Sequence, residues 1–182
     1  MLLTNSNKFL TGAAIVLFVV VYASCKNEKD PLDQYGSIVK TVMRNDAGAF
    51  RGLNFGEKMD SVVAKEKSPA AEADQGYLYY EYKIDSVGSF NITYDFDENG
   101  LSEIQSDVFV NSAVQTDSVF NSFKRYFDDH FGKNETDMGY NVWSVKSEKF
   151  GDIKINLTDE STDLTADEAP GKISVWIYPD KE

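Results

Sequence analysis

The sequence predicts an α+β fold: two helix-then-three-strand repeats forming a mainly antiparallel sheet with the helices packed on one face. Three observations predict it. Stretches of period-two alternation recur between turn signals, a helical pattern precedes each group of strands, and the triplet Asp-Ser-Val opens both groups, at 60–62 and 117–119. Because each predicted strand has one apolar face, the helices are expected to cover that side of the sheet.

The first repeat covers residues 54–110. Asp60 stands where an N-cap residue is expected, because its side chain can accept a hydrogen bond from the first turn of a helix. The dipeptide Asn99-Gly100 is a strong signal for a tight turn between two strands. The helix and the three strands of this repeat are expected at 61–67, 77–84, 90–96 and 101–110.

The second repeat covers residues 115–178, and Asp117 is its expected helix cap. Its longer helix carries a broad apolar stripe, which predicts that the helix packs on the sheet. The stripe consists of Val119, Phe120, Phe123, Tyr126, Phe127 and Phe131. The helix and strands of this repeat are expected at 118–130, 140–147, 150–158 and 172–178.

The chain is expected to divide into a signal peptide (1–24), a lipid-anchored tether (25–34) and a single α+β domain (35–182) made of the two repeats. Ahead of the first repeat, Asp30-Pro31 can cap and start a further helix. The apolar residues that follow are at helical spacing, although Gly36 interrupts them. They are Tyr35, Ile38, Val39, Val42 and Met43.

The N-terminal segment is typical of an exported lipoprotein. The run from Phe9 to Val21 is almost wholly apolar, yet it is shorter than the roughly 20 residues of a membrane span. Small residues then lead into Cys25, the only cysteine of the chain, as in a lipobox. Tyr22 stands where a lipobox usually has Leu. We therefore expect lipidation of Cys25, with an uncleaved N-terminal anchor as the alternative.

The charge of the chain restricts its partners. It has 18 Lys and Arg against 30 Asp and Glu in 182 residues, a net charge of −12. Removal of residues 1–24 takes away only Lys8, which leaves 17 basic residues against 30 acidic ones, or −13. Binding to nucleic acid needs a basic footprint, so no nucleic acid is expected as a partner. Lipid on Cys25 is the expected contact with the membrane.

One acidic motif resembles the opening of a calcium-binding loop. Asp95, Asp97 and Asn99 stand at alternate positions before Gly100. The twelfth position of such a loop holds a bidentate Glu, but here it holds Ser106. The flanking segments are also predicted strands, so a hairpin turn is the favoured interpretation. We expect no metal and no cofactor.

Catalytic constellations are sparse, and the sequence favours a non-enzymatic protein. His130 is the only histidine, at the end of a helix, where it can interact with the helix dipole. A Ser-His-Asp site built on it, or a pair of carboxylates of the glycosidase kind, remains the alternative. Either would make the protein a small extracytoplasmic hydrolase.

Two further features concern the surface. Asp85-Ser86-Val87 resembles the acceptor of bacterial O-glycosylation and falls in a predicted turn, so Ser86 is a candidate modification site. Four aromatic residues are candidates for the sheet face away from the helices, where they would form a contact surface for a protein or a glycan, and interior packing is the favoured alternative for at least half of them. They are Tyr77, Tyr79, Trp143 and Trp176.

Three segments carry a resemblance to known families: 50–56, 77–81 and 94–101. They resemble uncharacterised lipoproteins of the Bacteroidota across most of residues 35–178. The helix-then-strands layout also resembles small outer-membrane assembly lipoproteins of the BamE (SmpA/OmlA) kind, and its duplication resembles beta-lactamase-inhibitor-protein-like domains. These resemblances imply a protein-binding module of the cell envelope, anchored to the outer membrane, with a glycan-binding protein or a hydrolase as the alternative.

Overall fold

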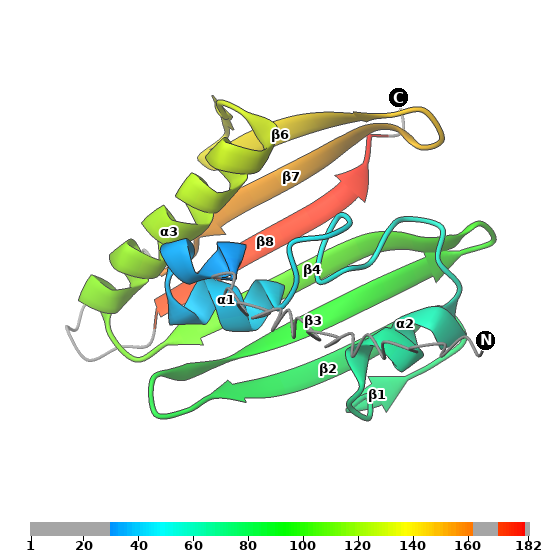
Figure 1. Ribbon diagram of the computed structural model, residues 1–182, viewed down its shortest axis with the longest axis horizontal. Coiled ribbons are helices and arrows are strands. Elements are labelled where there is room, and N and C mark those ends of the chain that lie inside the picture. The colour runs from blue at the N-terminus through cyan, green and yellow to red at the C-terminus, as the bar shows by residue number, and fades with distance from the viewer. Residues whose placement is uncertain (1–29, 162–170, 181–182) are drawn as a thin grey trace, which may run out of the picture.

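The computed structural model describes residues 30–161 and 171–180. Within them the fold is α+β, with helices over one eight-stranded antiparallel sheet of order β1-β2-β3-β4-β8-β7-β6-β5 (Figure 1). The predicted fold class and antiparallel sheet are therefore confirmed. The strands are β1 (Glu72–Ala73), β2 (Tyr77–Ile84), β3 (Gly88–Asp97), β4 (Gly100–Val110), β5 (Glu135–Asp137), β6 (Tyr140–Ser147), β7 (Gly151–Asp159) and β8 (Gly171–Pro179).

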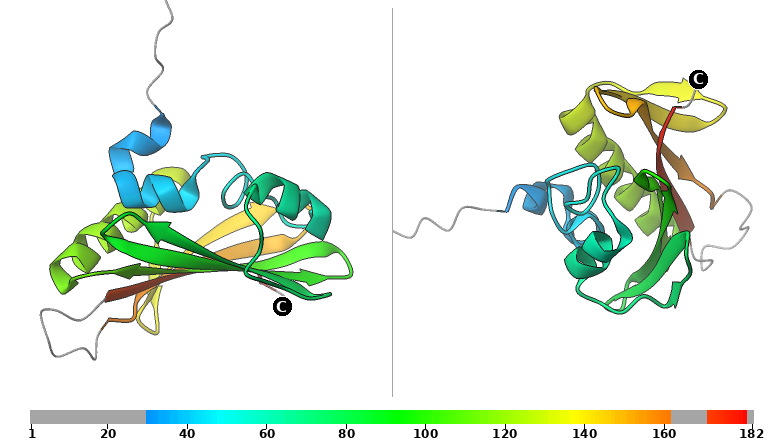
Figure 2. Two further views of the ribbon diagram at one scale, coloured as in Figure 1. Left: turned by 90° about the horizontal axis from the view of Figure 1, so that it is seen from below. Right: turned by 90° about the vertical axis from the view of Figure 1, so that its right-hand side faces the viewer.

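The described helices lie on the same face of the sheet (Figure 2). They are the short 3-10 helix η1 (Pro31–Tyr35) and the α-helices α1 (Ser37–Met43), α2 (Met59–Glu66) and α3 (Ala113–Phe131). Helix α3 packs across β6, β7 and β8, and both η1 and α1 contact α3. Helices α1 and α2 lie over the side of the sheet formed by β2, β3 and β4 (Figures 1 and 2).

The first described residue, Asp30, lies inside the segment that the sequence assigned to the tether, and it already belongs to the packed domain. Asp30 caps η1, with the backbone N–H of Leu32 donating to its carboxylate at 3.0 Å. Leu32 and Tyr35 are buried against the core. The helix predicted after Pro31 is split in two, because Gly36 adopts a φ of +88°, which ends η1 before α1 starts.

The N-cap residues of α2 and α3 differ from those predicted. Helix α2 starts at Met59 after Lys58, so Asp60 lies in its first turn, where a negative charge favours the helix dipole. Helix α3 is capped by Ser112, whose hydroxyl accepts from Gln115 N–H at 3.3 Å. Asp117 is therefore inside α3. Ser112 and Gln115 have the spacing of a capping box, the local signal that marks this start.

The tip of the β3–β4 hairpin holds the loop ahead of α2. Asp97 pairs with Gly100, which leaves Glu98 and Asn99 as the turn residues. The backbone N–H of Gly56 donates to Leu101 O, and Leu101 N–H donates to Glu57 O, both at 2.8 Å. The loop therefore extends the hydrogen bonding of β4 and fixes the position of α2.

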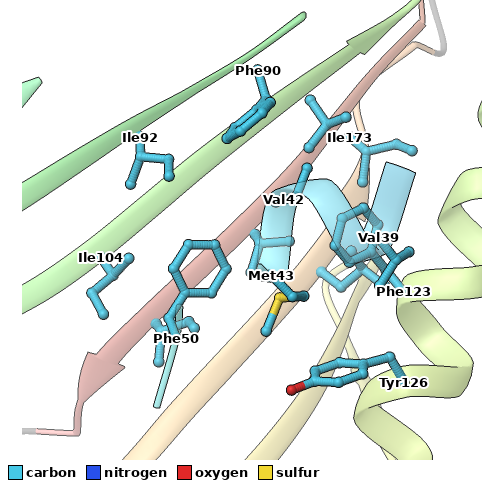
Figure 3. Close-up of a cluster of buried hydrophobic side chains, with 14 of the residues drawn as sticks. Val39, Val42, Met43, Phe50, Phe90, Ile92, Ile104, Phe123, Tyr126 and Ile173 are labelled. Carbon is cyan, nitrogen blue, oxygen red and sulfur yellow. The ribbon is translucent and has the colours of Figure 1, made fainter. Parts of the chain in front are cut away.

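One hydrophobic core joins the helices to the sheet. Residues distant in sequence meet in it, from α1, β3, β4, β8 and α3 (Figure 3). The residues labelled in Figure 3 are Val39, Val42, Met43, Phe50, Phe90, Ile92, Ile104, Phe123, Tyr126 and Ile173. Because β4 pairs with β8, the two strand groups form one continuous sheet over this core.

A charged cluster lies within the interior where α2 ends. The Glu66 carboxylate accepts hydrogen bonds from Arg51 Nε and Nη2, each at 3.0 Å, and from Arg44 Nη1 at 3.1 Å. The hydroxyls of Tyr82 and Tyr94 donate to the same carboxylate. Burial alone would raise the pKa of Glu66, but the hydrogen bonds and charge of Arg51, with the two hydroxyls, lower it below its usual value.

Candidate binding face

The sheet face opposite the helices, here called the open face, carries none of the described helices (Figure 2). Strand pairing aligns one residue from each strand in a transverse row on it. From edge to edge the row is Glu72, Tyr79, Thr93, Gln105, Trp176, Asn156, Val142 and Glu135. Neighbouring strands lie about 4.8 Å apart, so Tyr79 and Trp176, three strands apart, are separated by roughly 14 Å.

Tyr77 and Tyr79 lie on the open face of β2, as the alternation predicts. Their hydroxyls donate to carboxylates, Tyr77 to Glu72 at 3.2 Å and Tyr79 to Glu81 at 3.1 Å. The hydrogen bond to Glu72 raises the pKa of Tyr77, and burial followed by the hydrogen bond to Glu81 raises the pKa of Tyr79. A hollow of about 550 Å³ beside Tyr79 also includes Lys83, Asn91 and Phe109.

Trp176 lies at the centre of the row with 39% of its surface exposed. A hollow of about 180 Å³ is bounded by Trp176 and Tyr140, and Asn156 also lines it. A second hollow, of about 590 Å³, shares Tyr140 and Asn156 and continues to Tyr178. Sequence reasoning missed Tyr140, Asn156 and Tyr178 as surface residues. Alternation along the strands could have identified Asn156 and Tyr178, because they alternate with core residues of β7 and β8.

Trp143 was expected beside these aromatic residues but lies on the other face of β6, 1% exposed. Its ring packs against Phe127 of α3 at a centroid distance of 5.2 Å. Its indole N–H donates to Asp128 at 3.1 Å and to the carbonyl of Gly132 at 3.0 Å. Trp143 therefore belongs to the core and not to the contact surface.

The calcium-like motif has the geometry of a hairpin turn. The Asp97 carboxylate accepts from the backbone N–H of Asn99 at 2.8 Å. Asp95 pairs across the strands with Glu103; burial, together with the charge of Glu103, raises the pKa of Asp95. In residues 30–161 and 171–180 no group of three or more His, Cys, Asp or Glu side chains is arranged to hold a metal ion.

His130 lies on the helix side of the domain, away from the open face. Its Nε2 is 2.8 Å from the Asp46 carboxylate, and its Nδ1 is 2.7 Å from the backbone carbonyl of Tyr126. Its ring also packs on that of Tyr126, with centroids 4.1 Å apart. A general base needs a ring nitrogen directed at the proton it removes. Here both nitrogens are directed at acceptors inside the protein.

Of the two modification sites predicted from sequence, only Ser86 lies among the described residues. Ser86 is exposed in the turn between β2 and β3, and its carbonyl accepts from Asn111 Nδ2 at 2.7 Å. Its hydroxyl is therefore on the surface, where a modifying enzyme acts. Cys25 and the expected signal peptide lie outside the described residues.

Comparison of the chain with protein-family models, with curated proteins and with solved structures finds no match. What the open face can bind therefore follows from the chemistry of its own side chains.

Proposed function

We propose that the protein is an exported lipoprotein, anchored by lipid on Cys25 to the outer membrane of a bacterial cell, and that its domain is a non-enzymatic binding module for an envelope protein. The observation that carries the proposal is the open face, where Tyr79 and Trp176 stand in one transverse row on a sheet whose other face is buried. Large aromatic side chains of this kind are enriched at the centres of protein interfaces.

The charge of the open face suggests the chemistry of the partner. Asp95, Glu103 and Asp107 lie on its central strands, β3 and β4. Lys172, on the neighbouring strand, already pairs with Glu160 at 2.7 Å and with Asp107 at 3.4 Å. A partner with Lys and Arg around its docking surface complements this face, and such binding weakens as salt rises.

Support for the lipid anchor comes from the N-terminal sequence and not from the folded domain. Four residues separate Cys25 from Asp30, which caps the first described helix, so lipid on Cys25 would hold the domain close to the membrane. None of the helices in the described part of the chain is long and apolar enough to cross a membrane. Replacement Cys25→Ala should abolish incorporation of labelled fatty acid and release the protein from membranes. A Cys25→Ala protein that still fractionates with membranes after processing would exclude the lipid anchor.

The proposal includes a finer architecture, in which the domain consists of two related halves. In each half a helix, α2 or α3, precedes four strands in place of the predicted three; they form a meander, and the last strands, β4 and β8, pair with each other. Val62 and Val119, the last residues of the two Asp-Ser-Val triplets, are both buried. This duplication supports the resemblance to tandem-repeat binding modules on which the protein-binding proposal also draws.

The proposal is tested by affinity capture from envelope extracts with single surface variants. Tyr79→Ser and Trp176→Ser each remove an aromatic ring from the open face, and each should abolish capture of a defined partner. Val114→Ser is the matched control, because Val114 is 83% exposed on α3 at the opposite side. Capture that survives both open-face variants, or that is lost with Val114→Ser, would exclude the open face as the docking surface.

A hydrolase is the second candidate, and one observation favours it. Asp95 and Glu103 are directly opposed on the open face, and the pKa of Asp95 is raised by burial and by Glu103. Two neighbouring carboxyl groups whose environments shift their pKa values apart can serve as an acid-base pair. Hydrolysis of a glycan or peptide substrate that is lost in Asp95→Asn, with folding intact, would establish this function in place of the binding module.

A further inference from the structure

Asn156 lines a hollow of the open face and holds an unmatched polar atom beneath its surface. Its side chain is buried, with the whole residue only 9% exposed, and its Oδ1 has no hydrogen-bond donor among the described residues. Its Nδ2 donates to the hydroxyl of Tyr178 at 3.3 Å. A buried acceptor without a donor costs roughly 1–3 kcal/mol, so a donor from a water molecule or from a ligand would relieve that cost.

The chemistry of the amide selects the kind of ligand group. The oxygen and nitrogen of an Asn side chain are assigned from their hydrogen bonds, and the Tyr178 hydroxyl can either accept or donate. If the amide is turned over, Nδ2 becomes the unmatched atom in place of Oδ1. A ligand hydroxyl satisfies both orientations, because it is a donor and an acceptor at once.

Aromatic rings stand on either side of this amide. Trp176 and Tyr140 border the smaller hollow with 39% and 38% of their surfaces exposed. The ring of Tyr178 packs against Trp176 at a centroid distance of 4.4 Å, which restricts the movement of the indole. The faces of such rings carry partial negative charge and attract C–H groups with partial positive charge.

The remaining lining is polar and its cations are paired. Gln105, Thr158 and Ser174 add amide and hydroxyl groups to the smaller hollow, and Glu160 adds a carboxylate that is paired with Lys172 at 2.7 Å. Lys154 lies 3.5 Å from Asp180 and donates to Ser144 at 2.9 Å, and Lys172 is held by two carboxylates. With its lysines neutralised and the whole chain strongly acidic, this region favours a neutral ligand over an anionic one.

We propose that the hollow between Trp176 and Tyr140 is a subsite for one ring of a neutral saccharide, with Asn156 bonding a ring hydroxyl. A sugar ring has C–H faces and hydroxyl edges, which match aromatic walls with an amide between them. A peptide strand is less suited, because the backbone groups of β6, β7 and β8 are used in their ladders and only side chains face outward here. The adjoining hollow beside Tyr178 accommodates the next ring.

This inference does not depend on the protein partner proposed above. The probe is an array of neutral oligosaccharides, presented to the full lipidated chain in a detergent without a sugar headgroup. Binding of every variant is quantified on the array, and acrylamide quenching of tryptophan fluorescence locates the bound saccharide in the proteins that keep Trp176. Trp143 is buried and Trp176 is exposed, so quenching reports mainly on Trp176. Bound saccharide should shield Trp176 and reduce the quenching.

The variants separate this site from the rest of the face. Trp176→Ala and Asn156→Ala should each weaken saccharide binding by about tenfold or more, the loss expected for a hydrogen bond or a stacking contact. Trp176→Phe should retain part of the affinity, because a ring remains. Lys146→Ala is the control and should bind as well as wild type, because Lys146 is exposed on β6 and lines neither hollow. Thermal melts of each variant establish that it is folded.

Three results would overturn the inference. The first is an array on which no neutral oligosaccharide binds. The second is saccharide binding that is unchanged in a folded Trp176→Ala protein. The third is capture of a protein partner that requires Trp176 while no saccharide binds; that result assigns the hollow to the partner protein and leaves the proposed function standing. Saccharide binding without any protein capture would support the saccharide subsite and count against the proposed protein-binding function.

Discussion

Arg51 and Glu66 form a bidentate ion pair inside the domain, with Nε and Nη2 of Arg51 each 3.0 Å from a carboxylate oxygen of Glu66. The side chains are 3% and 0% exposed. Arg51 also donates through Nη1 to the backbone carbonyl of Thr41 at 3.2 Å and to that of Val42. The pair therefore joins α1, α2 and the loop between them above the first strands of the sheet.

Replacement Glu66→Gln should destabilise the domain strongly, because it leaves the Arg51 guanidinium buried without a counter-charge. Removal of one partner of a buried pair typically costs about 3–5 kcal/mol. Urea unfolding at neutral pH measures the loss. The control is Lys146→Ala, whose ion pair with Asp152 is long, at 3.9 Å, and exposed; it should leave the midpoint unchanged. Equal effects of the two variants would contradict a structural role for the pair.

The same carboxylate predicts a pH dependence. The pKa of Glu66 is lower in the folded state than the roughly 4.3 of an unfolded Glu. Its contribution to stability is therefore fully present above that unfolded value, and is lost as pH falls through the folded pKa. The difference in free energy of unfolding between wild type and Glu66→Gln should be larger at pH 7 than at pH 3. A difference that grows toward acid would reverse the sign and refute the assignment.

Phe127 and His130 should differ sharply in their importance to folding. Phe127 is fully buried, and its ring lies 6.3 Å from that of Phe123 and 5.2 Å from that of Trp143. Phe127→Ala should cost about 3–5 kcal/mol, a large part of the roughly 5–15 kcal/mol that holds a domain together. His130→Ala loses a partly exposed polar contact with Asp46, and about 1 kcal/mol or less is expected.

Thermal melts of both variants measure this difference, and a substrate screen adds a functional readout. A binding module should keep its activity in the folded His130→Ala protein. If that protein is stable but has lost a hydrolase activity present in wild type, the non-enzymatic assignment is wrong.

Gly100→Ala should destabilise more than Gly36→Ala. Both glycines have positive φ, +105° and +88°, so each substitution carries backbone strain of about 1–3 kcal/mol. A Cβ at Gly100 would also lie 2.6 Å from the carbonyl oxygen of Gly56 and 2.7 Å from that of Glu57, whereas a Cβ at Gly36 meets no atom within 4 Å. Chemical unfolding of the two variants isolates the steric term. Equal losses would show that the loop does not pack on the hairpin tip.

Calcium should have little effect on stability. The Asp97 carboxylate already accepts a hydrogen bond from Asn99 N–H, which closes the turn. Ser106 occupies the position where a calcium loop needs a bidentate carboxylate. A ligand at 100 times its dissociation constant would add about 2.7 kcal/mol. Millimolar calcium should therefore leave the melting temperature unchanged. A rise of several degrees that Asp97→Ala removes would restore the calcium interpretation.

Local patterns determined the elements of this protein. The predicted strands 77–84 and 140–147 have the bounds of β2 and β6, because alternation and turn residues act over a few neighbouring positions. The helical stripe of α3 likewise predicted that Phe123 and Phe127 pack together, and their rings do. Helix starts were less accurate, since Asp60 and Asp117 were favoured as caps over Lys58 and Ser112.

Tertiary structure alone decided the composition of the core and of the open face. Around Trp143 the apolar residues of β6 do not alternate cleanly, so only packing on Phe127 selects the face to which its ring points. The Arg51–Glu66 pair had no local signal, because the two residues meet only when α2 docks on the sheet. Likewise, it is the pairing of β4 with β8 that brings Trp176 into one row with Tyr79. Such contacts depend on the closure of long loops, and no short stretch of sequence encodes which distant strand becomes the neighbour.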